Sequence, residues 1–197
     1  MKIASFGLVA ALVLSAPSFA DWKLQADQSQ LFFSSVKKDI IAETHQFKTV
    51  QGVVSEDGQF SVSVDLASAE TGIPIRNERL AQFLFETTKF SQASAKGKID
   101  LAALGKQTIG SSQTVKLPVI FELHGKTITQ DASLTLTKLS ASQVAVVTSA
   151  PIFLNAADFD LLPGIEKLKE LAALPSISPL VPISLHLRFT HEASKKG

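Results

Sequence analysis

The histidines are the side chains of this sequence best suited to metal binding, and their spacing does not favour it. The chain contains four histidines and no cysteine. His186 and His191 are five residues apart, so on a continuous strand they face opposite sides. His45 and His124 have no second ligand at a typical metal-binding spacing. The sequence therefore predicts no metal site, no thiol nucleophile and no disulfide framework.

Motifs for catalysis are also missing from the sequence. It contains no G-x-S-x-G, no H-E-x-x-H, no P-loop and no dinucleotide-binding fingerprint. Asp158 and Asp160 are the nearest approach to a carboxylate pair, and a loop or helix-start role before Pro163 accounts for them better. We therefore expect no catalytic residue, no cofactor and a protein that is not an enzyme.

Most of the chain after residue 20 alternates apolar and polar residues. A period of two is typical of a β-strand that buries one face, and about eight such runs recur along the chain. The residues that the alternation places on the inner faces are Leu31, Phe33, Phe60, Val62, Val64, Leu117, Val119, Phe121, Leu134 and Leu136.

Turn signals separate these runs and predict how the strands are joined. Glu56-Asp57-Gly58 and His124-Gly125-Lys126 are typical of tight hairpins, so consecutive strands are expected to be antiparallel. Eight such strands leave two open edges, and closure into a barrel removes them. The predicted fold is all-β, an eight-stranded antiparallel lipocalin-like barrel with two short helices.

The two helices are predicted where the alternation breaks. In the segment from Asn77 to Thr87, apolar residues recur at helical spacing and Asn77 is a candidate N-cap. The segment from Pro163 to Leu174 is amphipathic and ends before Pro175.

The first twenty residues have the layout of a secretory signal peptide. Lys2 precedes an apolar run from Phe6 to Leu14, and small residues lead to an expected cleavage after Ala20. No later stretch predicts a transmembrane helix. We expect a single domain over 21–192, a short tail at 193–197, location in the periplasm and no stable insertion in the membrane.

Composition narrows the choice of partner. The net charge is +1 without a basic face, so nucleic acid is a poor candidate. Thirteen phenylalanines stand beside one tryptophan and no tyrosine, which indicates an interior built for apolar contents. Those contents are either a packed core or a lipid, and composition does not separate the two.

Several segments resemble the YceI-like lipid (polyisoprenoid)-binding family, over about residues 22–191. Departures from its pattern are Asn77, where the family usually has aspartate, Lys37-Lys38, where a histidine is common, and a longer 156–182 connection. The matching segments are Asp27 to Phe33, Gly52-Val53, Thr71-Gly72-Ile73, Arg76 to Leu80, Phe83 to Phe90, and Val115 to Gly125.

The resemblance implies an eight-stranded barrel around an elongated apolar channel. It also implies a periplasmic carrier of a long isoprenoid, either a quinone or a polyprenyl phosphate. The inner-face residues would then contact the lipid, and burial of its tail would contribute about 25 cal/mol per Å2. Two alternatives remain: a structural or interaction barrel with a filled core and, less favoured, an enzyme that acts on an isoprenoid.

Three further residues are candidates for the ligand site. Arg76 is placed to meet a phosphate or quinone oxygen, or else to form an ion pair with Glu78 or another acid. Phe83 and Phe85 either line one end of the channel or pack the helix on the barrel. Relatives in the family often pair, so a homodimer is allowed, although no feature of this sequence requires one.

Overall fold

The alternating segments form one antiparallel sheet that closes on itself. The computed structural model describes residues 21–191, so the expected signal peptide and the tail at 193–197 lie outside the described residues. The strands are β1 (Trp22–Leu24), β2 (Gln30–Lys37), β3 (Ile41–Phe47), β4 (Val50–Val54), β5 (Gln59–Asp65), β6 (Ala69–Glu70), β7 (Gln92–Lys98), β8 (Ser112–Leu123), β9 (Lys126–Lys138), β10 (Gln143–Thr148), β11 (Ile152–Asn155) and β12 (Leu180–His191).

The ring of strands contains eight ribbons, because four of them are each broken into two strands. β1 and β2 both pair with β12 on one side, and β10 and β11 both pair with it on the other. β3 and β4 are likewise separated only by Lys48 and Thr49. The ribbon that follows is broken as well, since β5 pairs with β4 and β6 pairs with β3. Each ribbon pairs with its neighbour in sequence, and the β1–β12 and β2–β12 pairings close the ring. The predicted eight-stranded antiparallel barrel is therefore confirmed.

The predicted hairpins have local causes. Gly58 has a φ of 85°, and a Cβ there would lie 2.1 Å from the carbonyl oxygen of Ile99, so the turn between β4 and β5 requires glycine. Between β8 and β9, His124 and Gly125 both have positive φ. This is the backbone of a two-residue turn that suits the twist of paired strands.

The helices differ from the prediction in their bounds. They are α1 (Pro74–Arg79), which continues into the π-helical turn η3 (Leu80–Leu84), α2 (Leu101–Lys106) and α3 (Leu162–Leu171). The expectation that Asn77 is an N-cap is wrong, because Pro74 occupies the first turn of α1 and Asn77 lies inside the helix. The short helix α2, with Asp100 as its N-cap, was not predicted.

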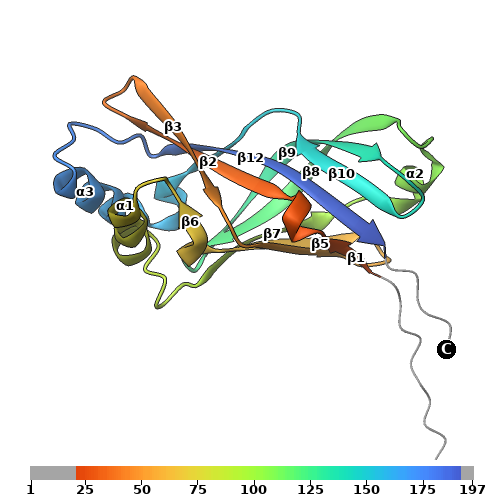
Figure 1. Cartoon of the computed structure of the whole chain (residues 1–197), viewed down its shortest axis with the longest axis horizontal. Coiled ribbons are helices and arrows are strands. Elements are labelled where there is room, and N and C mark those ends of the chain that lie inside the picture. The colour runs from red at the N-terminus through yellow and green to blue at the C-terminus, as the bar shows by residue number, and fades with distance from the viewer. Residues whose placement is uncertain (1–20, 192–197) are drawn as a thin grey trace, which may run out of the picture.

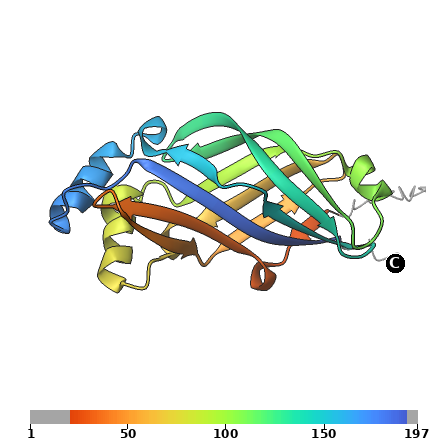
Figure 2. The same ribbon diagram turned by 90° about the horizontal axis from the view of Figure 1, so that it is seen from above.

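Helices cover the two ends of an elongated barrel. α1 and α3 lie together at one end with the tip of the β2–β3 hairpin, and α2 lies at the opposite end (Figure 1). Figure 2 shows the strands running obliquely along the long axis between these ends. Of the helices within residues 21–191, none has the length and apolar character to span a bilayer.

Candidate functional site

The barrel encloses a cavity of about 560 Å3 that extends along its interior. At one end the cavity is lined by Trp22, Leu101 and Leu104, and at the other by residues of α1 and α3. The barrel therefore contains space along its interior, which favours the channel over a filled core. All ten predicted inner-face residues line the cavity: Leu31, Phe33, Phe60, Val62, Val64, Leu117, Val119, Phe121, Leu134 and Leu136.

The inner face of the β2–β3 hairpin changes from apolar to polar toward the α1 end. Because β2 and β3 are paired in register and alternate residues share a face, two inward rows lie side by side. Their members in order toward the tip are Leu31, Phe33, Ser35 and Lys37 on β2, and Phe47, His45 and Glu43 on β3.

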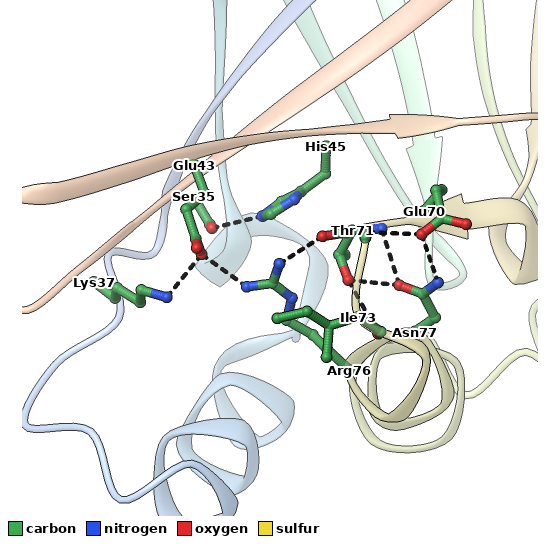
Figure 3. Close-up of polar contacts among 10 residues, drawn as sticks. Ser35, Lys37, Glu43, His45, Glu70, Thr71, Ile73, Arg76 and Asn77 are labelled. Carbon is green, nitrogen blue, oxygen red and sulfur yellow. Dashed lines mark hydrogen bonds and ion pairs between the residues drawn. The ribbon is translucent and has the colours of Figure 1, made fainter.

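Arg76 joins these rows from α1. Its Nη1 donates to Oε2 of Glu43 at 2.7 Å, and its Nη2 donates to the carbonyl oxygen of Thr71 at 2.7 Å (Figure 3). Lys37 contacts the same Glu43 oxygen at 2.9 Å. The predicted ion pair of Arg76 is thus with Glu43, and Arg76 also lines the cavity. We call Ser35, Lys37, Glu43, His45 and Arg76 the polar cluster.

Charges in the polar cluster are partly neutralised. The hydrogen bond from Lys37 and the Arg76 charge lower the pKa of Glu43, so it is ionised at neutral pH. Burial, followed by the Arg76 charge, lowers the pKa of His45, so its ring is neutral there. Lys37 and Arg76 against Glu43 leave the cluster with one net positive charge.

The loop before α1 holds Arg76 in place. Oδ1 of Asn77 accepts hydrogen bonds from the backbone N–H of Thr71 at 2.9 Å and from its hydroxyl at 2.6 Å. Nδ2 of Asn77 donates to Oε1 of Glu70 at 3.0 Å. These bonds fix the Thr71 carbonyl that Arg76 uses, so Asn77 is a positioning residue (Figure 3).

The polar cluster also contains a serine–histidine pair. Oγ of Ser35 lies 3.0 Å from Nε2 of His45. Acyl transfer needs a third group that orients the histidine through its other nitrogen, and within residues 21–191 Nδ1 of His45 is buried without a hydrogen-bond partner. Nε of Arg76 is buried without a partner as well. The arrangement offers hydrogen bonds to a polar group, and it lacks the order of a catalytic triad.

The aromatic candidates near α1 have different positions. Phe85 is buried and lines the cavity, as predicted for a channel residue. Phe83 is not among the described residues that line it; its carbonyl lies against Gly164 at the start of α3. The backbone of η3 at Phe83 thus packs closely on the start of α3.

The cavity reaches the surface beside α1. Ile73 and Ile75 line it, yet they are 45% and 52% exposed. This opening, which we call the mouth, lies on the tip side of the polar cluster. Among the described residues, no three histidine, aspartate or glutamate side chains are grouped as a metal site.

Sequence reasoning found Arg76 but missed the other members of the polar cluster. The alternation that places Leu31 and Phe33 on the inner face continues to Ser35 and Lys37, so the sequence did hold a signal for these two residues. Glu43 and His45 had no comparable signal, because their roles depend on register with β2 and on contact with a helix 33 residues further along the chain.

Together these features define a class of protein: a closed eight-stranded antiparallel barrel with a hollow apolar interior and a polar cluster at one end. The family model for the YceI-like domain matches residues 22–189. The chain belongs to this family, as the sequence resemblance predicted.

Solved structures show the same fold. A polyisoprenoid binding domain from Saccharophagus degradans, implicated in plant cell wall breakdown, is 36% identical with a TM-score of 0.85, covering 87% of this chain and 98% of its own. BcnA of Burkholderia cenocepacia is 16% identical with a TM-score of 0.65, covering 84% and 98%. The Campylobacter jejuni YCEI protein is 15% identical with a TM-score of 0.51, covering 76% and 85%. No curated protein sequence matches the chain.

Proposed function

We propose that this protein binds a long-chain isoprenoid lipid inside the barrel and carries it through the periplasm. The observation that carries the proposal is the apolar cavity that passes a polar cluster before it reaches the surface. Such a cavity matches an amphiphile with a long apolar tail and one polar headgroup. The most similar of the solved structures described above is itself a polyisoprenoid binding domain.

Binding of the tail is proposed to rest on burial alone. Each methylene transferred from water contributes about 0.8 kcal/mol, and the inward rows offer aliphatic and aromatic side chains along the barrel. A polar group on the tail would have no partner there. This selects hydrocarbon tails that carry no polar group.

The polar cluster favours a neutral quinone as the headgroup. Both Nη atoms of Arg76 already donate within the protein, and Glu43 balances one of the two cationic charges. Nε of Arg76 is a donor without a partner, and Nδ1 of His45 is a second one in the tautomer whose Nε2 accepts from the Ser35 hydroxyl. A quinone carbonyl is an uncharged acceptor for either. A buried donor without a partner costs about 1–3 kcal/mol, so a carbonyl that reaches these atoms gains affinity.

A polyprenyl phosphate is the second candidate, because Lys37 and Arg76 leave one positive charge in the cluster. The two headgroups are distinguished by competition. The delipidated protein is loaded with a fluorescent isoprenoid, which is then displaced with a quinone or a polyprenyl phosphate of equal tail length. Displacement at a lower concentration of the quinone supports the quinone assignment, and displacement at a lower concentration of the phosphate reverses it. If neither lipid displaces the fluorescent isoprenoid, the carrier function is contradicted.

A further inference from the structure

The end of the barrel that carries the mouth of the cavity has several exposed aliphatic side chains. Ile40, at the tip of the β2–β3 hairpin, is 86% exposed, more than any other large apolar residue within residues 21–191. Ile41 is exposed beside it, and Ile73 and Ile75 are exposed at the start of α1. Single exposed apolar residues are common on soluble proteins. Four exposed isoleucines at one end of the molecule are unusual, and exposed apolar patches mark surfaces that bind.

The hairpin and α1 are connected at the mouth. Ile41 continues the inward row of Glu43 and His45 past the rim of the barrel, and Glu43 contacts Arg76, the residue next to Ile75. The tip of the β2–β3 hairpin and α1 lie at the same end of the molecule in both views (Figures 1 and 2). The four isoleucines therefore lie at the end of the molecule where the cavity opens.

The structure holds the tip of the hairpin in its exposed position. The backbone N–H of Lys38 donates to the carbonyl oxygen of Ser176 at 3.1 Å, and the Ser176 hydroxyl donates to Oδ1 of Asp39 at 2.7 Å. Lys38 and Asp39 both have positive φ, which non-glycine residues adopt rarely. The turn is fixed by the segment that follows α3, so Ile40 is kept in water and has no place in the core.

We propose that this end of the barrel docks on the surface of a lipid bilayer through Ile40, Ile41, Ile73 and Ile75. The inference rests on the proposed function, because an isoprenoid that resides in a bilayer must enter the cavity from that bilayer. The patch is continuous with the opening of the apolar cavity, so a docked barrel gives the tail a path out of the membrane that avoids water.

The spacing of residues along β3 fits insertion of the hairpin tip into the bilayer. Ile41 and Glu43 are two residues apart on one strand, which separates them by about 7 Å. Interfacial apolar groups enter a bilayer by about 5–10 Å. With Ile41 among the acyl chains, the polar cluster lies at the level of the lipid headgroups, where a quinone or phosphate headgroup also resides.

The charges at the mouth indicate that the apolar side chains provide the binding. Lys37 and Arg76 are both paired with Glu43, and Lys167 and Lys169 on α3 are paired with acids on the same helix. Binding to the bilayer should therefore persist at high salt and on neutral phosphatidylcholine vesicles.

The experiment is flotation of the delipidated protein with phosphatidylcholine vesicles, comparing the wild type with Ile40→Asp and Ile109→Asp. Ile109 is a matched control, since it is 60% exposed in the loop after α2, at the opposite end. The wild type and Ile109→Asp are expected to float. Ile40→Asp is expected to bind at least about tenfold more weakly, because the burial of an isoleucine among the acyl chains is lost. Wild type that stays in solution, equal flotation of Ile40→Asp, or equal loss in Ile109→Asp would overturn the proposal.

Two further measurements separate this inference from its competitors. Ile40 does not line the cavity, so Ile40→Asp is expected to take up an isoprenoid diluted from ethanol as the wild type does. A wild type that floats but takes up no isoprenoid would overturn the carrier function and leave docking intact. A dimer that dissociates in Ile40→Asp, with no vesicle binding by the wild type, would reassign the patch to a second copy of the chain.

Discussion

Replacing Ala95 with phenylalanine tests whether the interior of the barrel is hollow. Ala95 lies on the inner face of β7 between Val62 and Phe121, lines the cavity and remains partly accessible within it. The new ring would project into the cavity. Fully burying a phenylalanine contributes about 1.5–3 kcal/mol relative to exposure, and lost side-chain freedom offsets up to about 1–2 kcal/mol. The free energy of unfolding should therefore stay constant or rise by about 1 kcal/mol.

If the core is filled, the free energy of unfolding should change in the opposite direction. Overpacking costs about 1–3 kcal/mol, so the same substitution would lower the free energy of unfolding. The assay is urea denaturation of delipidated protein, followed by the fluorescence of the single tryptophan, Trp22. Isoprenoid uptake, measured in parallel, should fall because the ring occupies the path of the tail. A clear loss of stability together with normal uptake would refute the reasoning.

Three other substitutions probe the packing and the polar cluster. Val119→Glu should abolish isoprenoid uptake and lower the free energy of unfolding by roughly 2–3 kcal/mol. The control Ile120→Glu, on the outer face of the same strand, should change it by less than about 0.5 kcal/mol. Normal uptake by folded Val119→Glu would argue against the inward assignment. Gly164→Ala should lower the free energy of unfolding by about 1–3 kcal/mol in urea denaturation, because its Cβ would lie 2.5 Å from a backbone oxygen of η3. An unchanged free energy of unfolding would contradict the close packing of α3. Burial lowers the pKa of His45 from 6.5. Below pH 6.5 the unfolded chain therefore binds a proton that the folded chain does not. The free energy of unfolding of the wild type should thus fall as the pH drops. His45→Gln should fall less steeply, and identical profiles would contradict a buried neutral ring.

Strand parity was the most reliable information in the sequence. The alternation around Leu117, Val119 and Phe121 predicts an inner and an outer face, and the burial of β8 follows it. Parity is a local property of the backbone, and an apolar interior enforces it on every strand. The breaks between β1 and β2, and between β3 and β4, were not predictable, because they depend on how one ribbon bends to follow its partners.

The errors lie where tertiary contacts override local signals. Asn77 resembles an N-cap in sequence, but its side chain binds the Thr71 backbone in the loop before the helix. Glu43 and Arg76 meet only because the β2–β3 hairpin and α1 are brought to the same end of the barrel. No spacing along the chain encodes that contact.

The most direct test of a lipid-carrying barrel is native mass spectrometry of the protein purified from its own compartment without detergent. We predict a mass increase equal to one isoprenoid per chain, with the lipid identified after organic extraction. A bare mass that persists after incubation with both quinones and polyprenyl phosphates would contradict the account.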